Sequence, residues 1–103
     1  MTGREDWTDE NTNALFEALL TLETIPETER FFRDLCTLRE LEELSRRWAV
    51  VRRLAEGDPY RAIAEDTGVS TATVTRISHW LRHGTGGYGL ALERLGLSQP
   101  EGS

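Results

Sequence analysis

The stretch from residue 60 to residue 79 has the order of residues expected for two short helices joined by a tight turn. Gly68 stands where the turn needs a left-handed backbone, which costs little only when the residue has no Cβ. Val69 supplies an apolar residue to the turn. The hydroxyl of Ser70 is suited to cap the N-terminus of the second helix. These features at fixed offsets predict a helix-turn-helix.

The two predicted helices have distinct inward and outward faces. Ile63, Val74 and Ile77 fall on the inward faces, and Ala64 falls where the helices must approach closely. The second helix then presents a partly exposed set of mostly small polar residues: Thr71, Ala72, Thr73, Thr75, Arg76 and His79. A helix of this kind fits the DNA major groove, with its N-terminal residues nearest the base edges. An ordinary helical hairpin is the alternative interpretation.

The distribution of charge supports a nucleic-acid partner, although the formal net charge is −6. Residues 1–43 contain four arginines and twelve carboxylates, a balance of −8. Residues 44–83 contain seven arginines and four carboxylates, a balance of +3, and both histidines. The positive charge therefore accompanies the predicted helix-turn-helix. All twelve basic residues are arginines, which favour bidentate contacts with phosphate and guanine.

Length and composition indicate a single all-α domain over residues 1–103, with tails at 1–6 and 98–103 that we expect to be disordered. The sequence has no apolar run of membrane-spanning length. Residues 1–13 are polar and acidic rather than typical of a signal peptide, so a cytoplasmic location is expected.

No enzymatic or metal-binding constellation stands out. One cysteine and two histidines give no zinc-type spacing, and no cofactor is expected. His79 and His83 lie four residues apart, a spacing that could hold a metal, but no third ligand follows at helical spacing. Contact with phosphate, or simple exposure, is the preferred interpretation of this pair.

Helical spacing of apolar residues predicts six helices and no strand. The expected N-caps are Thr8, Thr24, Thr37, Asp58 and Ser70. The longest helix should end near Glu56, with Gly57 as a left-handed cap. The second helix of the helix-turn-helix should span 71–83, and a last short helix should span 88–95. Short amphipathic helices need more apolar partners than one small chain supplies, so we expect a homodimer.

Several segments resemble the tryptophan repressor superfamily. They are Leu35-Cys36-Thr37, the stretches 43–47 and 54–57, and Thr-Gly-Val-Ser-Thr-Ala-Thr-Val-Thr-Arg at 67–76. The ending His-Gly-Thr-Gly-Gly-Tyr at 83–88 points to the YerC/YecD branch of that superfamily. The resemblance implies a six-helix fold in an intertwined homodimer with one helix-turn-helix in each protomer. Such a dimer reads a near-palindromic DNA operator, with half-sites about one helical turn apart.

The resemblance also carries over DNA contacts. Arg61 matches a position on the first helix that reaches a guanine, and Arg82 matches a basic residue near the end of the second helix. The start of the second helix, where base and phosphate contacts arise, is matched by Ser70, Thr71, Ala72, Thr73 and Thr75. Arg46, Arg52 and Arg53 could touch phosphate, although a solvated helix face is the preferred interpretation of each.

The effector pocket implied by the resemblance is altered. Arg47 and Arg76 match the two arginines that flank bound tryptophan, and Thr37 matches a pocket residue. Ile77 stands where the pocket needs glycine, and Trp80 stands where a small serine is expected. Either side chain would overfill a pocket built for a free indole, so we expect that the protein does not bind L-tryptophan. Another small effector, such as a carboxylate, stays open.

We therefore expect a sequence-specific transcriptional regulator that binds double-stranded DNA as a homodimer, with no membrane partner and no enzymatic activity. A protein-interaction module that keeps the fold without binding DNA is the alternative. The operator, the target genes and the sign of regulation do not follow from the sequence.

Overall fold

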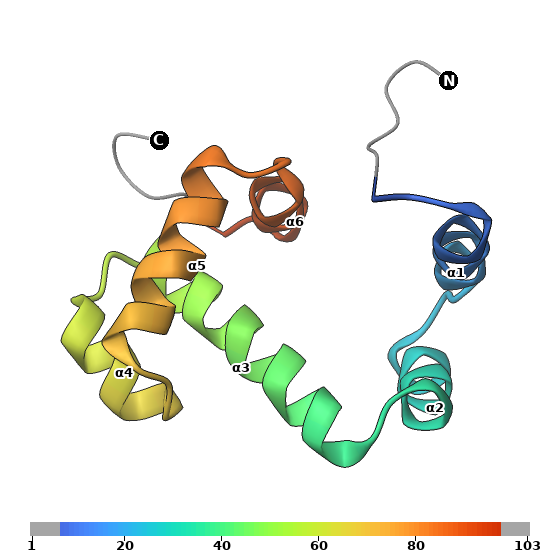
Figure 1. The fold of residues 1–103 in the computed structure, drawn as a ribbon, viewed down its shortest axis with the longest axis horizontal. Coiled ribbons are helices and arrows are strands. Elements are labelled where there is room, and N and C mark those ends of the chain that lie inside the picture. The colour runs from blue at the N-terminus through green and yellow to red at the C-terminus, as the bar shows by residue number, and fades with distance from the viewer. Residues whose placement is uncertain (1–6, 98–103) are drawn as a thin grey trace. The chain divides into compact units, whose positions relative to one another are not determined.

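The structure, a computed structural model, describes residues 7–97, and these residues form six α-helices and no strand (Figure 1). The helices are α1 (Glu10–Leu20), α2 (Ile25–Leu35), α3 (Leu38–Ala55), α4 (Tyr60–Thr67), α5 (Thr71–His83) and α6 (Gly87–Leu95). The all-α fold and the number of helices predicted from the sequence are confirmed for this part of the chain. The predicted tails, 1–6 and 98–103, lie outside the described residues.

Local capping explains where the first helices begin. The prediction of Thr8 as the first N-cap is wrong, since Asp9 caps α1 by accepting a hydrogen bond from the Thr12 amide at 2.8 Å. Thr24 caps α2 as predicted, by accepting from the Glu27 amide. Thr37 and Glu40 form a complete capping box at the start of α3, because each side chain accepts from the other residue's amide.

The cap of α4 differs from the prediction. Asp58 does not cap this helix; Pro59 occupies the N-cap position without any side-chain hydrogen bond. The Asp58 carboxylate instead accepts from Nε of Arg53, which lies near the end of α3. An arginine five residues earlier thus competes successfully for the carboxylate. The left-handed backbone expected at Gly57, which ends α3, is present with φ +86°.

Contacts within the chain divide the described residues into two units, 7–41 and 42–97. The first unit contains α1, α2 and the first turn of α3, and neither α1 nor α2 has a buried residue. Its apolar side chains pack only partly, as in the edge-to-face contact of Trp7 with Phe16 at a centroid distance of 6.0 Å. Large apolar residues such as Leu20 and Ile25 stay exposed. The single domain predicted from the sequence stays a prediction, because the described residues divide into two units.

The second unit contains the hydrophobic core. The core is formed by the C-terminal half of α3 and by the inward faces of α4, α5 and α6: Val50, Val51, Leu54, Ala55, Ile63, Val74, Ile77, Leu81 and Leu92. Within this unit α4 lies beside α5, and α6 follows α5 (Figure 1). The inward positions predicted for Ile63, Val74 and Ile77 are confirmed, since each is at most 2% exposed.

Helical spacing predicts an apolar stripe on α3, and this stripe is only partly buried in one chain. Its predicted members are Leu38, Leu41, Leu44, Trp48, Val51 and Leu54 or Ala55. Val51 and Leu54 are buried, but Leu44 is 43% exposed and Leu38 is 62% exposed. Val50, which the stripe omitted, is fully buried. Val50 is buried together with Val51, Leu54 and Ala55 because the C-terminal half of α3 packs in one core with residues of α4, α5 and α6. The buried face of this half is therefore wider than one helical stripe.

Candidate nucleic-acid interface

The turn between α4 and α5 has the local geometry that the sequence predicts. Gly68 has φ +81°, and its amide donates to the Ala64 carbonyl at 2.9 Å, which closes α4. Val69 packs against the core. Ser70 caps α5 by accepting from the Thr73 amide at 3.1 Å. Gly68 thus ends α4 and Ser70 begins α5, so these two residues determine the three-residue connection between the helices.

α5 has one buried face and one exposed face. Val74, Ile77, Ser78 and Leu81 are buried. All but one of the predicted DNA-contact residues are exposed, on α4, on α5 or at the cap of α5: Arg61, Ser70, Thr71, Ala72, Thr75, Arg76, His79 and Arg82. The exception is Thr73, which is half-buried and whose hydroxyl oxygen accepts a hydrogen bond from the Ser70 hydroxyl. The structure therefore leaves these side chains accessible, while the contacts assigned to them stay predictions.

Two of these arginines make no ion pair among the described residues. Arg61 and Arg76 are exposed, and neither lies within ion-pair distance of a carboxylate in that part of the chain. Guanidinium groups that are not neutralised within the protein can bind phosphate or guanine without first breaking an internal contact.

A polar relay, which is a short chain of side-chain hydrogen bonds, joins α4 to α5 next to this surface. The Tyr60 hydroxyl and the Ser78 hydroxyl are 2.6 Å apart, and Nε of Arg82 donates to Ser78 Oγ at 3.4 Å. Ser78 is 4% exposed and is the one buried polar residue among those described. The relay was not anticipated from the sequence. Its signal was a serine on the inward face of α5, a position where a buried hydroxyl requires a partner.

Arg53 is committed to the protein rather than to phosphate. Its guanidinium binds Asp58 through Nε and Asp66 through Nη2, the latter at 2.9 Å. The hydrogen bond to Asp58 and then the one to Asp66 raise the pKa of the Arg53 guanidinium above its ordinary value. Phosphate contact by Arg53 is therefore not supported, and its role is to hold α4 against the end of α3.

The residues predicted to line an effector pocket are mostly brought together. A pocket of about 330 Å³ lies between α3 and α5. Four of the five predicted residues line it: Arg47, Arg76, Ile77 and Trp80. Thr37 belongs to the first unit, where it caps α3. Glu43, Arg46, Val69 and Thr73 complete the lining of the pocket.

The charged and apolar walls of this pocket are distinct. Arg47 lies 4.0 Å from Glu43, one helical turn earlier on α3. Ile77 belongs to the core at 2% exposure, whereas Trp80 is 51% exposed. Glu43 and Arg46 could have been found from the sequence, since residues three and four positions apart share one helix face with Arg47 or with each other.

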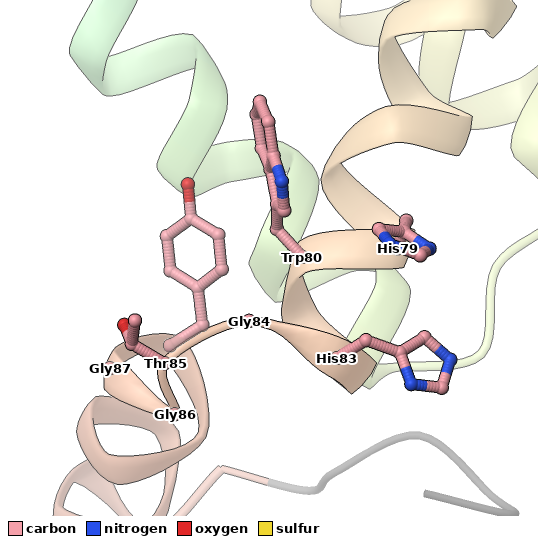
Figure 2. Close-up of a pocket in the computed structure, with 8 residues that line it drawn as sticks. His79, Trp80, His83, Gly84, Thr85, Gly86 and Gly87 are labelled. Carbon is pink, nitrogen blue, oxygen red and sulfur yellow. The ribbon is translucent and has the colours of Figure 1, made fainter.

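A second, larger pocket of about 700 Å³ lies where α5 ends and α6 begins. Its walls are the last turn of α5, the glycine-rich connection and the start of α6. The lining residues are His79, Trp80, His83, Gly84, Thr85, Gly86, Gly87 and Tyr88. Figure 2 shows His79 and His83 on one side of α5, with Trp80 projecting from another side of the helix.

A search of residues 7–97 for membrane-spanning segments finds no helix with the length and apolar character that a span requires.

The fold is that of the tryptophan-repressor-like proteins, a class of small all-α chains. Two crystal structures share it. A TrpR-like protein from Eubacterium eligens has a TM-score of 0.81 and 42% identity over 86% of this chain and 92% of that chain. A Trp repressor candidate from Staphylococcus aureus has a TM-score of 0.84 and 34% identity over 96% of this chain and 99% of that chain.

The chain belongs to the Trp repressor protein family, whose family model matches residues 10–96. It is 42% identical to the uncharacterized protein YerC of Bacillus subtilis over 89 residues, which are 86% of each chain. It is 38% identical to a Trp operon repressor homolog of Chlamydia trachomatis over 72 residues, covering 65% of this chain and 77% of that protein. The predicted resemblance to the YerC branch is confirmed.

Proposed function

We propose that the protein is a sequence-specific, DNA-binding transcriptional regulator that acts in the cytoplasm and has no enzymatic activity. The observation that carries this proposal is the exposed N-terminal end of α5. There Thr71, Thr75 and Arg76 lie on one accessible side of a helix whose other side is buried. Exposed hydroxyl, methyl and guanidinium groups are what direct readout of base edges in the major groove requires. Arg61, exposed on α4, adds a contact to guanine.

The proposed DNA-binding form is an intertwined homodimer. The support is the set of apolar side chains that one chain leaves uncovered on α1, α2 and α3, including Leu20 at 86% exposure, Ile25 at 75% and Leu38 at 62%. An apolar pocket of about 470 Å³, lined by residues of α2 with Leu41, belongs to the same unit. Apolar surface of this extent indicates a protein partner, and a second copy also supplies the two-fold symmetry of a palindromic operator.

The proposed regulator does not respond to L-tryptophan. Ile77 fills its place in the core, and the Trp80 indole already forms part of the wall of the arginine-lined pocket. Three arginines in that wall, Arg46, Arg47 and Arg76, suit a small anionic effector. The same arginines could equally serve phosphate or local carboxylates, as Glu43 does for Arg47.

A gel-shift series at low salt tests the proposal against its alternative, a protein-interaction module. The protein is titrated into random duplex and into fragments of genomic DNA. We expect binding that is stronger to particular genomic fragments and that weakens in Arg61→Ala and in Thr73→Ala. Indifference to DNA at low salt would contradict the proposal and favour a protein partner for the acidic residues 1–43.

A further inference from the structure

The two histidines of the chain lie side by side on α5. His79 and His83 are one helical turn apart, and their ring centroids are 5.0 Å apart with an interplanar angle of 45°. Both side chains are exposed. The close-up shows both imidazoles on the same side of the helix, apart from Trp80 (Figure 2).

This separation matches the geometry of two imidazoles bound to one metal ion. A metal–nitrogen bond of about 2.0–2.1 Å places the ion about 3.2 Å from the centroid of each ring. For angles at the metal between square and tetrahedral values, the two centroids then lie about 4.5–5.2 Å apart. The observed 5.0 Å falls in this interval, so the spacing of the two rings is compatible with a shared ion.

The space beside the pair is open enough for the other ligands of an ion. Both histidines line the pocket of about 700 Å³ at the junction of α5 and α6. Three glycines, Gly84, Gly86 and Gly87, contribute to its wall. No group of three or more His, Cys, Asp or Glu side chains gathers among the described residues. The protein therefore supplies two ligands, and water or an anion completes the coordination.

The surrounding charge restricts which ions can bind. Arg76 and Arg82 are the arginines nearest to the pair along α5, and both are exposed. Hard cations such as Mg²⁺ and Ca²⁺, which need carboxylate or carbonyl oxygens, gain nothing here. Ions that bond strongly to the imidazole lone pair, namely Cu²⁺, Ni²⁺ and Zn²⁺, can offset the unfavourable charge.

We propose that His79 and His83 form an open, two-histidine site for a divalent transition-metal ion on the exposed side of α5. The order of affinity is Cu²⁺ above Ni²⁺ and Zn²⁺, as expected for nitrogen ligands. The site shares His79 with the predicted DNA contacts, but metal binding by the free protein depends only on the two imidazoles.

Calorimetric titration of the full chain with NiCl₂ tests the site, with Cys36→Ser as the background so that the thiol cannot contribute. We expect one ion per chain. His79→Ala and His83→Ala should each weaken binding about tenfold or more, because chelation by the second imidazole is lost. The double variant should show no measurable binding, because no imidazole remains to hold the ion. Binding that is absent in the parent, or unchanged in the double variant, overturns the proposal.

A matched control keeps two histidines but separates them. Arg76→His combined with His79→Ala places imidazoles at 76 and 83, about 10.5 Å apart along the helix, too far for one ion. We expect this variant to bind as weakly as His79→Ala. Circular dichroism of each variant checks that the helices are retained, and Ni²⁺ should raise the Tm of the parent but not that of the control. Equal affinity in the control and the parent would show that the pair does not chelate.

Discussion

Tyr60 at the first position of α4 and Ser78 in the third turn of α5 are joined by their hydroxyl oxygens, 2.6 Å apart. Eighteen residues separate them in the chain, so this bond fixes the two helices of the proposed DNA-reading unit to each other. Ser78 also accepts from Nε of Arg82, a predicted DNA contact. Stability of the unit and the orientation of one of its arginines therefore depend on a single buried hydroxyl.

Replacing Tyr60 with Phe should lower the free energy of unfolding by about 1–3 kcal/mol, because the buried Ser78 hydroxyl loses its closer partner. Urea denaturation measures the change. Tyr88→Phe is the matched control, since the Tyr88 hydroxyl forms no hydrogen bond among the described residues, and it should change stability by less than about 0.5 kcal/mol. Equal effects of the two substitutions would show that the bond does not stabilise the protein.

Arg61→Ala should cost about 1–3 kcal/mol of binding to the preferred operator and relax specificity, because a guanine contact is removed. The measurement is the ratio of affinities for operator and random duplex at fixed salt. Arg94→Ala, which removes an exposed arginine of α6, should leave this ratio unchanged. If Arg61→Ala also leaves the ratio unchanged, Arg61 does not read the operator.

Leu44→Ala should destabilise the protein by about 2–5 kcal/mol, the cost of truncating a buried leucine. Leu44 is 43% exposed in one chain, so a cost of that size requires a second copy to cover it. The urea midpoint of the parent should rise with protein concentration, as it does for a dimer that dissociates on unfolding. A midpoint in Leu44→Ala equal to that of the parent would mean that this side chain is not covered.

Titration calorimetry with L-tryptophan should give no heat of binding at micromolar ligand. The physical reason is the presence of Ile77 and Trp80 in the wall where a free indole would need space. Ile77→Gly combined with Trp80→Ser restores small residues, and we expect weak binding in this variant. Clear micromolar binding to the unaltered protein refutes the expectation.

Acid should release the cap of α1. The amide of Thr12, and then its side chain, hydrogen-bond to the Asp9 carboxylate and hold its pKa below the ordinary value of 3.8. A carboxylate with a depressed pKa stabilises the fold above the ordinary pKa, and this stabilisation is lost as the pH falls through the lowered pKa.

The chemical shift of the Thr12 amide proton should therefore titrate with a midpoint below 3.8. Asp9→Asn keeps an acceptor for the amide and should abolish this titration. A midpoint at or above 3.8 in the unaltered protein contradicts the capping role of the charged carboxylate.

The sequence was most informative where local chemistry determines structure. The left-handed glycines at 57 and 68 and the cap at Ser70 followed from single residue types with strong backbone preferences. Prediction was wrong where two residues could take one role. Thr8 and Asp9 both suit an N-cap, and Asp58 suits both a cap and the partner of Arg53. Such competition is decided by tertiary geometry.

In the candidate site, the sequence predicts which side chains of α5 are exposed, but it does not predict which groups the arginines bind. Helical spacing was enough to separate Val74 and Ile77 from the exposed Thr71 and Thr75. The commitment of Arg53 to two aspartates depends on how α4 lies against α3, which spacing does not encode. The same holds for the exposed apolar residues of α3, because periodicity predicts that a face is covered but not what covers it.

Selection of bound sequences from a pool of random duplexes is the decisive test of DNA reading by α5. We expect enrichment of a near-palindromic motif whose half-sites lie about one helical turn apart, since two copies of α5 would enter successive major grooves. Recovery of sequences no different from the starting pool, at a salt concentration where DNA is retained, would contradict it.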